Sequence, residues 1–437
     1  MKAFISALVG VALVGAVAAA GAQSTQFIPV LSYRVGPYAA GGSGYYGGAI
    51  DYWTLLNMTG GINGVQLSWE ECETEYNASK GVECYERLKK KNGGASTVEP
   101  LSTGIAYGLF DRVAQDKIPM TTFGYGLASS ADGSVYPWVF PVGTTYWDQM
   151  AAMIAYLGQK EGGLDKLKGK KVAFLYHDSA YGKEPIPVLD ALGAKLGFET
   201  MKIPVTPPGQ TMESQWLQIR QAKPDYVIVW TYGVMSTVAL KTAAKTGYPK
   251  DKMLGVWWAG SEEDVIPAGD AAKGYVSASF TASGTNFPVM QDIKNKVYGA
   301  KKGNLEDPSR LGNVMYTRGV VYGMIVAEAI RVAQGKYGKG KVMAPEQLRW
   351  GYENLNLTES RIKDLGAGGL FPPIKTTCAD HEGSGMVKFQ QWTGAGFKQV
   401  TPFMAGDRAM VRKMVEEQAR KYAAEKKITP RDCAKEG

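Results

Sequence analysis

The feature that most constrains this chain is an alternation of strand-like and helix-like segments that runs through it twice. In the first run the predicted strands lie at 27–34, 65–72 and 118–123, and the predicted helices at 45–58, 78–91 and 105–116. After Lys171, predicted strands at 172–177, 198–203, 226–231, 253–258 and 275–280 alternate with helices at 184–196, 211–222 and 235–246. Strands that alternate with helices form βαβ units and parallel sheets. The pattern predicts an α/β protein with two doubly wound parallel-sheet lobes.

The last third of the chain departs from this alternation. Long helices are predicted at 312–334 and 407–426, with a hairpin between them formed by 386–392 and 397–403. No Ser/Gly-rich linker separates the two alternating runs near 141–150. We therefore expect the two lobes to be closely coupled.

The N-terminus has the pattern of an export signal. Lys2 precedes an apolar, small-residue run from Ala3 to Ala20, and an A-x-A site ends at Ala22. A basic start, an apolar middle and a small-residue cleavage site are typical of a secretory signal peptide, here residues 1–22. An uncleaved anchor helix is the alternative, which the glycines in the run disfavour. We expect a periplasmic protein with no membrane insertion after cleavage, because no later run reaches ~18 apolar residues.

Composition narrows the class of partner. The chain has 49 Lys and Arg against 41 Asp and Glu, a net charge of +8 that is small for 437 residues. The positive charge is not gathered in one arm, so nucleic-acid binding is disfavoured. With 45% apolar and 21% charged residues, the composition is that of an ordinary globular protein.

Four cysteines remain after the signal peptide. An even number in an oxidising compartment favours disulfides, and four cysteines allow three pairings. We favour Cys72–Cys84 and Cys378–Cys433, because each pair joins neighbours within one region. A zinc site is the alternative, but the chain has no CxxC spacing and only two histidines. We expect no metal and no cofactor.

A glycine-rich segment follows the first predicted strand. Gly42, Gly44 and Gly47 fit a G-x-G-x-x-G pattern, as in dinucleotide-binding proteins. The strand ends near Arg34, about seven residues too early for the tight turn of that motif. An exported protein is also separated from the nicotinamide pool. We interpret the segment as a flexible loop whose backbone approaches a ligand, and include Ser43 among the candidate ligand residues.

Candidate binding residues follow the predicted strands of the first lobe. Open α/β sheets bind ligands at the carboxyl ends of their strands, where helix N-termini offer free N–H groups. The candidates there are Ser102, Thr103, Gly104, Gly124, Tyr125 and Gly126. Hydroxyls and amides of this kind suit a carboxylate. The alternative for Ser102 and Thr103 is an ordinary helix N-cap, and the two roles can coexist.

The corresponding edge of the second lobe is aromatic. Its candidates are His177, Asp178, Tyr181, Thr231, Tyr232, Trp257 and Trp258. Aromatic side chains at three successive strand ends would form an apolar wall with polar groups at its rim. The sequence therefore predicts a ligand-binding cleft between the lobes, although each residue taken alone is explained as well by core packing.

Signs of catalysis are few. The chain has neither a GxSxG nor an HExxH motif. His177 and Asp178 could belong to a proton relay, but a strand-end histidine bonded to nearby groups explains them better. We predict that the protein is not an enzyme. A hydrolase that works through carboxylates is the alternative from another class.

Several short segments, taken in order, resemble one family. The resemblance rests on Gly60-Gly61-Ile62-Asn63-Gly64, Leu101-Ser102-Thr103, Ile118-Pro119-Met120, Tyr181-Gly182 and the run from Gly269 to Gly274. It covers most of the mature chain. These pieces are similar to leucine/isoleucine/valine-type periplasmic binding proteins, which have the type I periplasmic-binding fold and serve ABC importers.

The resemblance implies a domain arrangement and a partner. Two lobes would be joined by a three-crossover hinge and close over a small solute, and the closed form would dock on a membrane permease. The N-terminal lobe would comprise 23–144 and about 281–378, and the C-terminal lobe 145–280 and about 379–437. An exported sensor of the same fold that signals to a membrane receptor is the alternative.

The resemblance also implies roles for single residues. Ser102 or Thr103, with the backbone of Gly124 and Gly126, would hold a carboxylate. Tyr181 and Tyr232 would close on the ligand from the other lobe, and Tyr316 would line the pocket.

One position departs from the family pattern. Amino-acid binders of this family place an acid at a second-lobe strand end to neutralise the ligand's ammonium group, where this chain has Trp257 and Trp258. Glu262 or Glu263 is the alternative counter-charge. Because burying an unpaired ammonium is costly, the departure favours an acid without an amine, with an aromatic acid stacked on the indoles as one form.

Overall fold

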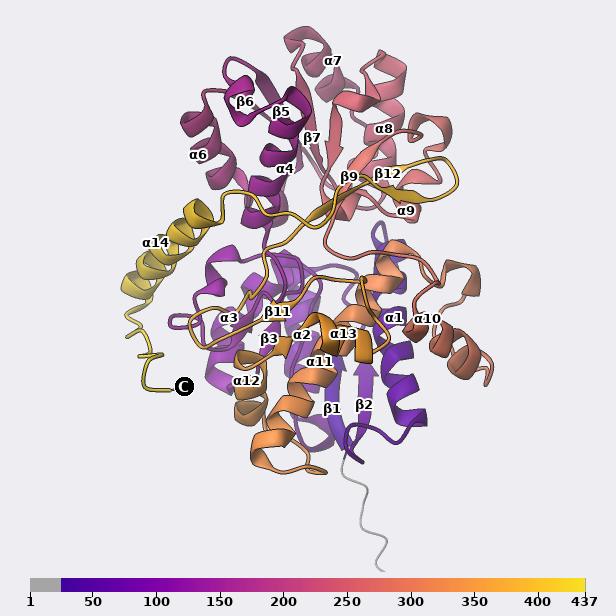
Figure 1. Ribbon diagram of the computed structural model, residues 1–437, viewed down its shortest axis with the longest axis vertical. Coiled ribbons are helices and arrows are strands. Elements are labelled where there is room, and N and C mark those ends of the chain that lie inside the picture. The colour runs from indigo at the N-terminus through magenta and orange to yellow at the C-terminus, as the bar shows by residue number, and fades with distance from the viewer. Residues whose placement is uncertain (1–24, 437) are drawn as a thin grey trace, which may run out of the picture.

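The structure is a computed structural model that describes residues 25–436. Two lobes lie one above the other along the long axis of the molecule (Figure 1). The predicted signal peptide lies outside the described residues. No helix within 25–436 has the length and apolar character needed to cross a bilayer.

The first lobe is built on short parallel strands. β1 (Thr25–Val30) pairs with β2 (Gln66–Glu71), and β3 (Met120–Thr121) pairs with β4 (Val139–Phe140). Isolated parallel bridges from Val30 to Glu99 and from Val98 to Met120 join the two pairs into one layer. The strand ends of this layer point toward the second lobe, so the residues that follow them face the space between the lobes (Figure 1).

The second lobe contains a seven-stranded sheet in the order β13-β12-β9-β8-β7-β5-β6. Its parallel part comprises β5 (Lys171–His177), β6 (Glu199–Val205), β7 (Tyr226–Trp230), β8 (Met253–Gly255) and β9 (Val276–Ser279). β12 (Lys388–Trp392) runs antiparallel to β9 and forms the predicted hairpin with β13 (Phe397–Gln399). Strands β5 and β7 are buried nearly throughout, as expected for parallel strands covered on both faces. The predicted α/β class with two doubly wound lobes is confirmed.

Helices cover both sheets. In the first lobe they are α1 (Ala39–Met58), α2 (Ala78–Leu88), α3 (Thr103–Asp116), α10 (Pro288–Asp292), α11 (Val314–Tyr337), α12 (Pro345–Glu353) and α13 (Glu359–Asp364). In the second lobe they are α4 (Tyr146–Glu161), α5 (Ala180–Lys183), α6 (Ile186–Leu196), α7 (Glu213–Ala222), α8 (Val234–Thr246) and α9 (Glu262–Val265). A short antiparallel pair, β10 (Asn356–Leu357) and β11 (Ile374–Lys375), lies beside α13.

Single helical turns of other kinds complete the described elements. Turns of 3-10 helix span Lys91–Gly93, Ala128–Ala131, Leu164–Leu167, Lys250–Lys252, Trp257–Ala259, Gly269–Ala271 and Pro308–Arg310, and a π turn spans Ile293–Tyr298. The predicted strand at 253–258 is therefore too long. It ends at Gly255, and the two tryptophans stand on the turn that follows it.

Before its last helix the chain passes between the lobes at three places. It leaves the first lobe between β4 and α4, returns between β9 and α10, and leaves again between β11 and β12 (Figure 1). The last helix, α14 (Arg408–Lys426), packs against α4 of the second lobe. It also reaches the first lobe, where Lys426 forms an ion pair with Asp111 of α3 at 2.9 Å. Helix α14 thus straddles both lobes.

The glycine-rich segment is helix, so the predicted flexible loop is wrong. Helix α1 already begins at Ala39, and two of its glycines, Gly44 and Gly48, lie against α11. A Cβ atom on Gly48 would lie 2.0 Å from the carbonyl oxygen of Tyr316, and one on Gly319 would lie 1.8 Å from that of Tyr45. The glycines therefore serve the close approach of two long helices, a requirement that overrides their low helix propensity.

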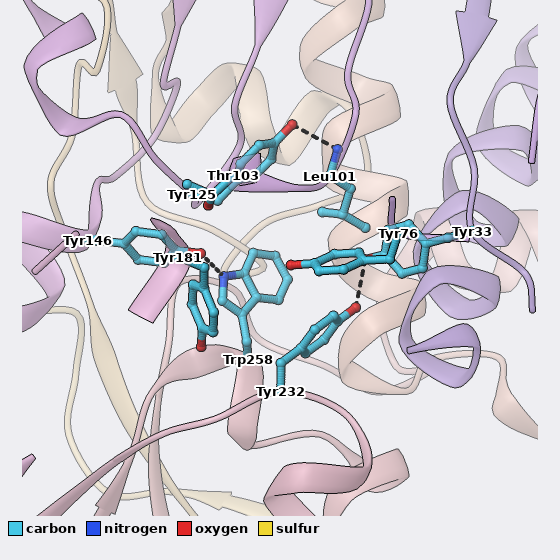
Figure 2. A pocket seen from close by; sticks show the side chains of 9 residues that line it. All are labelled: Tyr33, Tyr76, Leu101, Thr103, Tyr125, Tyr146, Tyr181, Tyr232 and Trp258. Atoms are coloured by element: carbon cyan, nitrogen blue, oxygen red, sulfur yellow. Dashed lines mark hydrogen bonds between the residues drawn. The ribbon is translucent and has the colours of Figure 1, made fainter. Parts of the chain in front are cut away.

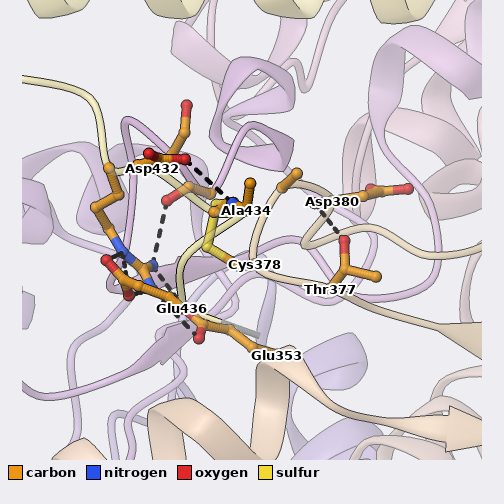
Figure 3. Close-up of a disulfide and its surroundings, with 12 residues drawn as sticks. Glu353, Thr377, Cys378, Asp380, Asp432, Ala434 and Glu436 are labelled. Carbon is orange, nitrogen blue, oxygen red and sulfur yellow. Dashed lines mark hydrogen bonds and ion pairs between the residues drawn. A yellow bond between two sulfur atoms is a disulfide. The ribbon is translucent and has the colours of Figure 1, made fainter.

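Both predicted disulfides, Cys72–Cys84 and Cys378–Cys433, are confirmed. Cys72 follows β2 and Cys84 lies in α2, so the first bond closes the loop between them. The second bond ties the C-terminal tail to the segment between β11 and β12 (Figure 3). Beside it, Arg431 of the tail forms an ion pair with Glu353 of α12 at 2.6 Å, which further anchors the tail to the first lobe.

Candidate ligand-binding site

A small cavity lies between the lobes (Figure 2). It is lined by Tyr33, Tyr76, Leu101, Thr103, Tyr125, Tyr146, Tyr181, Tyr232 and Trp258. Most of these residues directly follow a strand or begin a helix. The cavity therefore occupies the crevice at the carboxyl ends of the strands, the position at which open α/β sheets bind ligands.

Thr103 brings unpartnered polar groups to this cavity. Its hydroxyl is buried and has no hydrogen-bond partner among the described residues. Thr103 is also the first residue of the 14-residue helix α3, where the first amides have no intrahelical acceptor. A hydroxyl and free amides at a helix N-terminus form a suitable site for an anionic group.

The tyrosine and tryptophan side chains are held by hydrogen bonds. Trp258 donates from Nε1 to the Tyr146 hydroxyl at 2.8 Å, and the Tyr181 hydroxyl donates to the carbonyl oxygen of Thr231 at 3.0 Å. The Tyr125 hydroxyl accepts from the Leu101 amide at 2.9 Å (Figure 2). Burial raises the pKa of Tyr125, Tyr146 and Tyr181 well above the usual value, so these hydroxyls remain neutral.

None of the nine lining residues is charged. The two alternative counter-charges, Glu262 and Glu263, point elsewhere. Glu262 accepts from the amide of Val314 at 2.9 Å, and Glu263 forms an ion pair with Arg310 at 2.6 Å. Both bonds join α9 of the second lobe to the segment around the start of α11. The cavity itself holds no group that would neutralise an ammonium.

A buried cation lies behind the aromatic wall. The guanidinium carbon of Arg318 is 5.0 Å from the ring centre of Trp258 and 4.7 Å from that of Phe280. Its Nη1 donates to the carbonyl oxygen of Trp257 at 2.8 Å, and burial lowers its pKa to about 10. Arg318 therefore stays charged at neutral pH. Burial raises the pKa of Glu262 and Asp264 to about 7, so each of these nearby acids is about half ionised at neutral pH.

Five predicted ligand residues line this cavity: Thr103, Tyr125, Tyr181, Tyr232 and Trp258. The other predicted residues have different surroundings. Ser102 caps α3 by accepting from the Ile105 amide at 3.4 Å, as the alternative interpretation had it. Trp257 donates from Nε1 to the carbonyl oxygen of Gly124 at 2.9 Å, so these two residues bind each other across the cleft.

The remaining predicted residues do not line the cavity. Tyr316 donates its hydroxyl to Asp51 at 2.7 Å within the first lobe. Ser43 lies on α1, within the segment predicted as a loop. Gly126 borders Thr103: a Cβ atom there would lie 3.1 Å from the Thr103 methyl group.

His177 is a structural residue here. Its Nε2 lies 2.8 Å from the hydroxyl of Tyr38 in the first lobe, and its Nδ1 lies 2.8 Å from the hydroxyl of Ser179. Asp178 pairs with Lys183 at 2.7 Å instead. Burial lowers the pKa of His177 to about 4, so the ring is neutral at physiological pH. The interpretation as a strand-end histidine fits this geometry, and its bond to Tyr38 joins the lobes.

Four lining residues were missed: Tyr33, Tyr76, Leu101 and Tyr146. Tyr33 ends the first predicted strand segment and could have been found by the same rule that selected Tyr125. Tyr146 begins a helix directly after the chain passes between lobes, which no local pattern marks. Tyr76 lies in the loop closed by Cys72–Cys84 and has a positive φ of 59°, and no local pattern marks it either.

Solved structures of this fold resemble the chain over most of its length. A protein of the Pseudomonas fluorescens group, described as an ABC transporter permease, is 45% identical, with a TM-score of 0.88 over 94% of this chain and all of that one. A branched-chain amino acid ABC transporter protein from Thermus thermophilus with bound valine is 21% identical, with a TM-score of 0.75 over 90% of this chain and 99% of that one.

A solute-binding protein of an ABC transporter from R. palustris, solved with benzoate, is 18% identical, with a TM-score of 0.68 over 88% of this chain and 98% of that one. None of the curated proteins compared with the chain matches it. The family model described as periplasmic binding protein matches residues 25–397. With its two α/β lobes and the cavity between them, the chain belongs to the periplasmic binding protein family, whose members are solute-binding proteins of the leucine/isoleucine/valine-binding type.

Proposed function

We propose that this protein is an exported receptor that captures a small carboxylate without an ammonium group and delivers it to the permease of an ABC importer. The observation that carries the ligand class is the cavity lining, which combines unpartnered donors at Thr103 with no acidic side chain. An α-amino acid would leave its ammonium unpaired in this cavity, at a cost of several kcal/mol. A carboxylate would be favoured by the nearby Arg318 cation.

The shape and chemistry of the cavity support a compact, planar or aliphatic acid. In this structure the cavity has room for little more than one water molecule, so a bound acid must be compact and must hold the lobes slightly further apart. Six tyrosines and Trp258 offer ring faces for stacking. The R. palustris protein of the same fold holds benzoate, which makes aromatic acids a natural first choice for this chain.

Capture would work by closure of the lobes. Bonds between lobes, such as Tyr38–His177 and Gly124–Trp257, form only when the lobes meet. A ligand that contacts both lobes binds the closed form better than the open one and so shifts the population toward it. The ligand leaves unchanged, and cleavage after Ala22 releases the receptor into the periplasm.

The test uses pairs of ligands that differ only in the α-amino group. Isothermal titration calorimetry would compare 3-phenylpropionate with L-phenylalanine and 4-methylpentanoate with L-leucine on the mature protein. We expect each acid without the amine to bind at least tenfold more tightly. Tight binding of leucine or phenylalanine without binding of their deaminated partners would refute the proposal. NMR of the released ligand checks that it is unaltered.

A further inference from the structure

A second hollow, of about 240 Å³, lies beside the ligand cavity. It is lined by Pro37, Tyr38, Ala40, Gly41, Tyr232, Gly233, Val234, Thr237, Ser261, Glu263, Asp264 and Pro267. Tyr232 lines both spaces, and it is the only residue that the two linings share. One side chain therefore divides the small inner cavity from a larger outer one.

Tyr232 belongs to the second lobe and is held in this position by residues of the first lobe. Its hydroxyl lies 2.7 Å from that of Tyr33, and its ring stacks on Tyr38 with 5.2 Å between ring centres and 5° between ring planes. Gly41 leaves room for it, because a Cβ atom on Gly41 would lie 2.6 Å from the Tyr232 hydroxyl oxygen. The side chain is buried and closes the inner cavity when the lobes meet.

The position of Tyr232 relative to Thr103 gives a bound acid a direction. In Figure 2 these two residues lie on opposite sides of the Trp258 indole. An acid whose carboxylate binds at Thr103 would therefore point its other end toward Tyr232. Asp264 accepts from the Ser261 hydroxyl at 2.8 Å, and Glu263 pairs with Arg310 through Oε1, while its Oε2 is buried without a partner among the described residues. The rest of the lining, with Pro37, Val234 and Pro267, is uncharged and mostly apolar. The outer hollow thus suits an uncharged, apolar tail.

We propose that Tyr232 is a specificity-determining residue that limits the length of the ligand, and that removing its side chain joins the two spaces and admits acids with longer tails. This inference rests on the proposed function, because it takes the carboxylate at Thr103 as one end of the ligand. With Tyr232 in place, a tail longer than the inner cavity would prevent the lobes from closing.

The experiment measures Kd by calorimetry for benzoate and for its 4-ethyl, 4-butyl and 4-hexyl derivatives. The proteins are the wild type, Tyr232→Ala, Tyr232→Leu and Tyr232→Phe, with Tyr248→Ala as control. Tyr248 lies in the second lobe, contacts Trp216 and lines neither space. Circular dichroism and thermal melts confirm that each variant is folded. If Tyr232→Ala does not fold, Tyr232→Leu takes its place as the variant without the aromatic ring.

We expect the wild type to lose at least tenfold in affinity between benzoate and 4-butylbenzoate. In Tyr232→Ala or Tyr232→Leu the ratio of the two Kd values should fall at least tenfold. Tyr232→Phe, which keeps the ring, and Tyr248→Ala should keep the wild-type ratio within threefold. Wild-type binding of benzoate with the same ratio in every variant would overturn the length limit alone. No binding of any of these acids to the wild type would overturn the proposed ligand class and the length limit with it.

Discussion

Glu184 of the second lobe accepts a hydrogen bond from the backbone amide of Ala128 in the first lobe, with 2.8 Å between Oε1 and N. Its other oxygen is buried without a partner among the described residues. Burial raises the pKa of Glu184 to about 8, and the charge of nearby Asp148 acts in the same direction. The carboxyl is therefore protonated at neutral pH while the lobes are together.

This relationship predicts that ligand binding weakens as pH rises through 8. In the open form the Glu184 carboxyl would meet water and ionise near 4.3, so closure takes up one proton. The free energy that the protonated Glu184 contributes to closure is therefore complete below about pH 4.3 and is lost as the pH rises to about 8. Affinity should fall roughly tenfold between pH 7 and pH 9. Glu184→Gln should abolish most of this dependence in calorimetric titrations.

Other groups at the interface set the pH window for that measurement. Glu262, with a pKa raised to about 7 by burial, acts in the same sense as Glu184. His177 acts in the opposite sense, because burial lowers its pKa to about 4 and closure releases its proton below about pH 6.5. In the range from pH 7 to pH 9 the histidine stays neutral, but Lys388, whose pKa burial lowers to about 8, titrates along with the carboxyls, so the comparison with Glu184→Gln is needed to assign the change. A flat profile in the wild type would contradict the role of Glu184.

Thr103→Val should weaken carboxylate binding without destabilising the protein. The Thr103 hydroxyl has no partner among the described residues, so its loss removes only a bond to the ligand, on the order of 1–2 kcal/mol or about tenfold in Kd. Thr122→Val is the matched control, since its hydroxyl is also buried and unpartnered but does not line the cavity. Equal loss of affinity in both variants would count against a carboxylate at Thr103.

Arg318→Met should lower the preference for anions over neutral analogues. The guanidinium lies behind Trp258 and acts through space, a contribution on the order of 1–2 kcal/mol at this separation. We expect the ratio of benzamide to benzoate Kd to fall about tenfold while benzamide binding is kept. The substitution also removes the bond from Arg318 to the Trp257 carbonyl, so thermal melts must first show that the variant is folded. The exposed Arg220→Met is the control, and an unchanged ratio in Arg318→Met would argue against this role.

Gly48→Ala should destabilise the first lobe, because a Cβ atom there would lie 2.0 Å from a backbone carbonyl oxygen of α11. Overpacking of this kind costs about 1–3 kcal/mol or more. Gly335→Ala on α11 has open space around it and should instead stabilise the helix by about 0.5–1 kcal/mol. Urea unfolding followed by circular dichroism separates the two outcomes. Similar shifts in both variants would contradict the close packing of α1 and α11.

Replacing both Cys72 and Cys84 by Ser should lower the affinity for the ligand as well as the stability of the protein. The bond closes a short loop that carries Tyr76 into the cavity, and its loss should cost about 3 kcal/mol in unfolding free energy. The Cys378–Cys433 bond closes a longer loop, so replacing this pair by Ser should lower the unfolding free energy by about 4 kcal/mol. Only the first pair touches the loop of a lining residue, so only its loss should raise the Kd once unfolding is accounted for.

Much of the fold could be predicted because each signal was local. Buried parallel strands such as 172–177 are largely runs of apolar residues. The last helix was predicted at 407–426 and is observed as α14 at Arg408–Lys426, with Asp407 as its N-cap. The two disulfides join near neighbours within a region. The strand-end rule then placed Thr103, Tyr125, Tyr181, Tyr232 and Trp258 at one crevice, because the ends of parallel strands meet at one edge of a sheet.

The tertiary structure alone decided what depends on contacts between distant segments. Gly44, which was predicted in a loop, lies in helix α1 because α11 packs against it more than 250 residues later: a Cβ atom on Gly44 would lie 3.1 Å from the Cβ of Met315. Trp257 and Trp258 are adjacent in sequence, yet one binds Gly124 and the other lines the cavity, because a helical turn points them in different directions. Arg318 and Tyr146 reach the site only through packing. The sequence by itself therefore determined the two lobes and the sheet edges at which a ligand binds. The chemistry of the cavity was decided only by the way in which the two lobes meet.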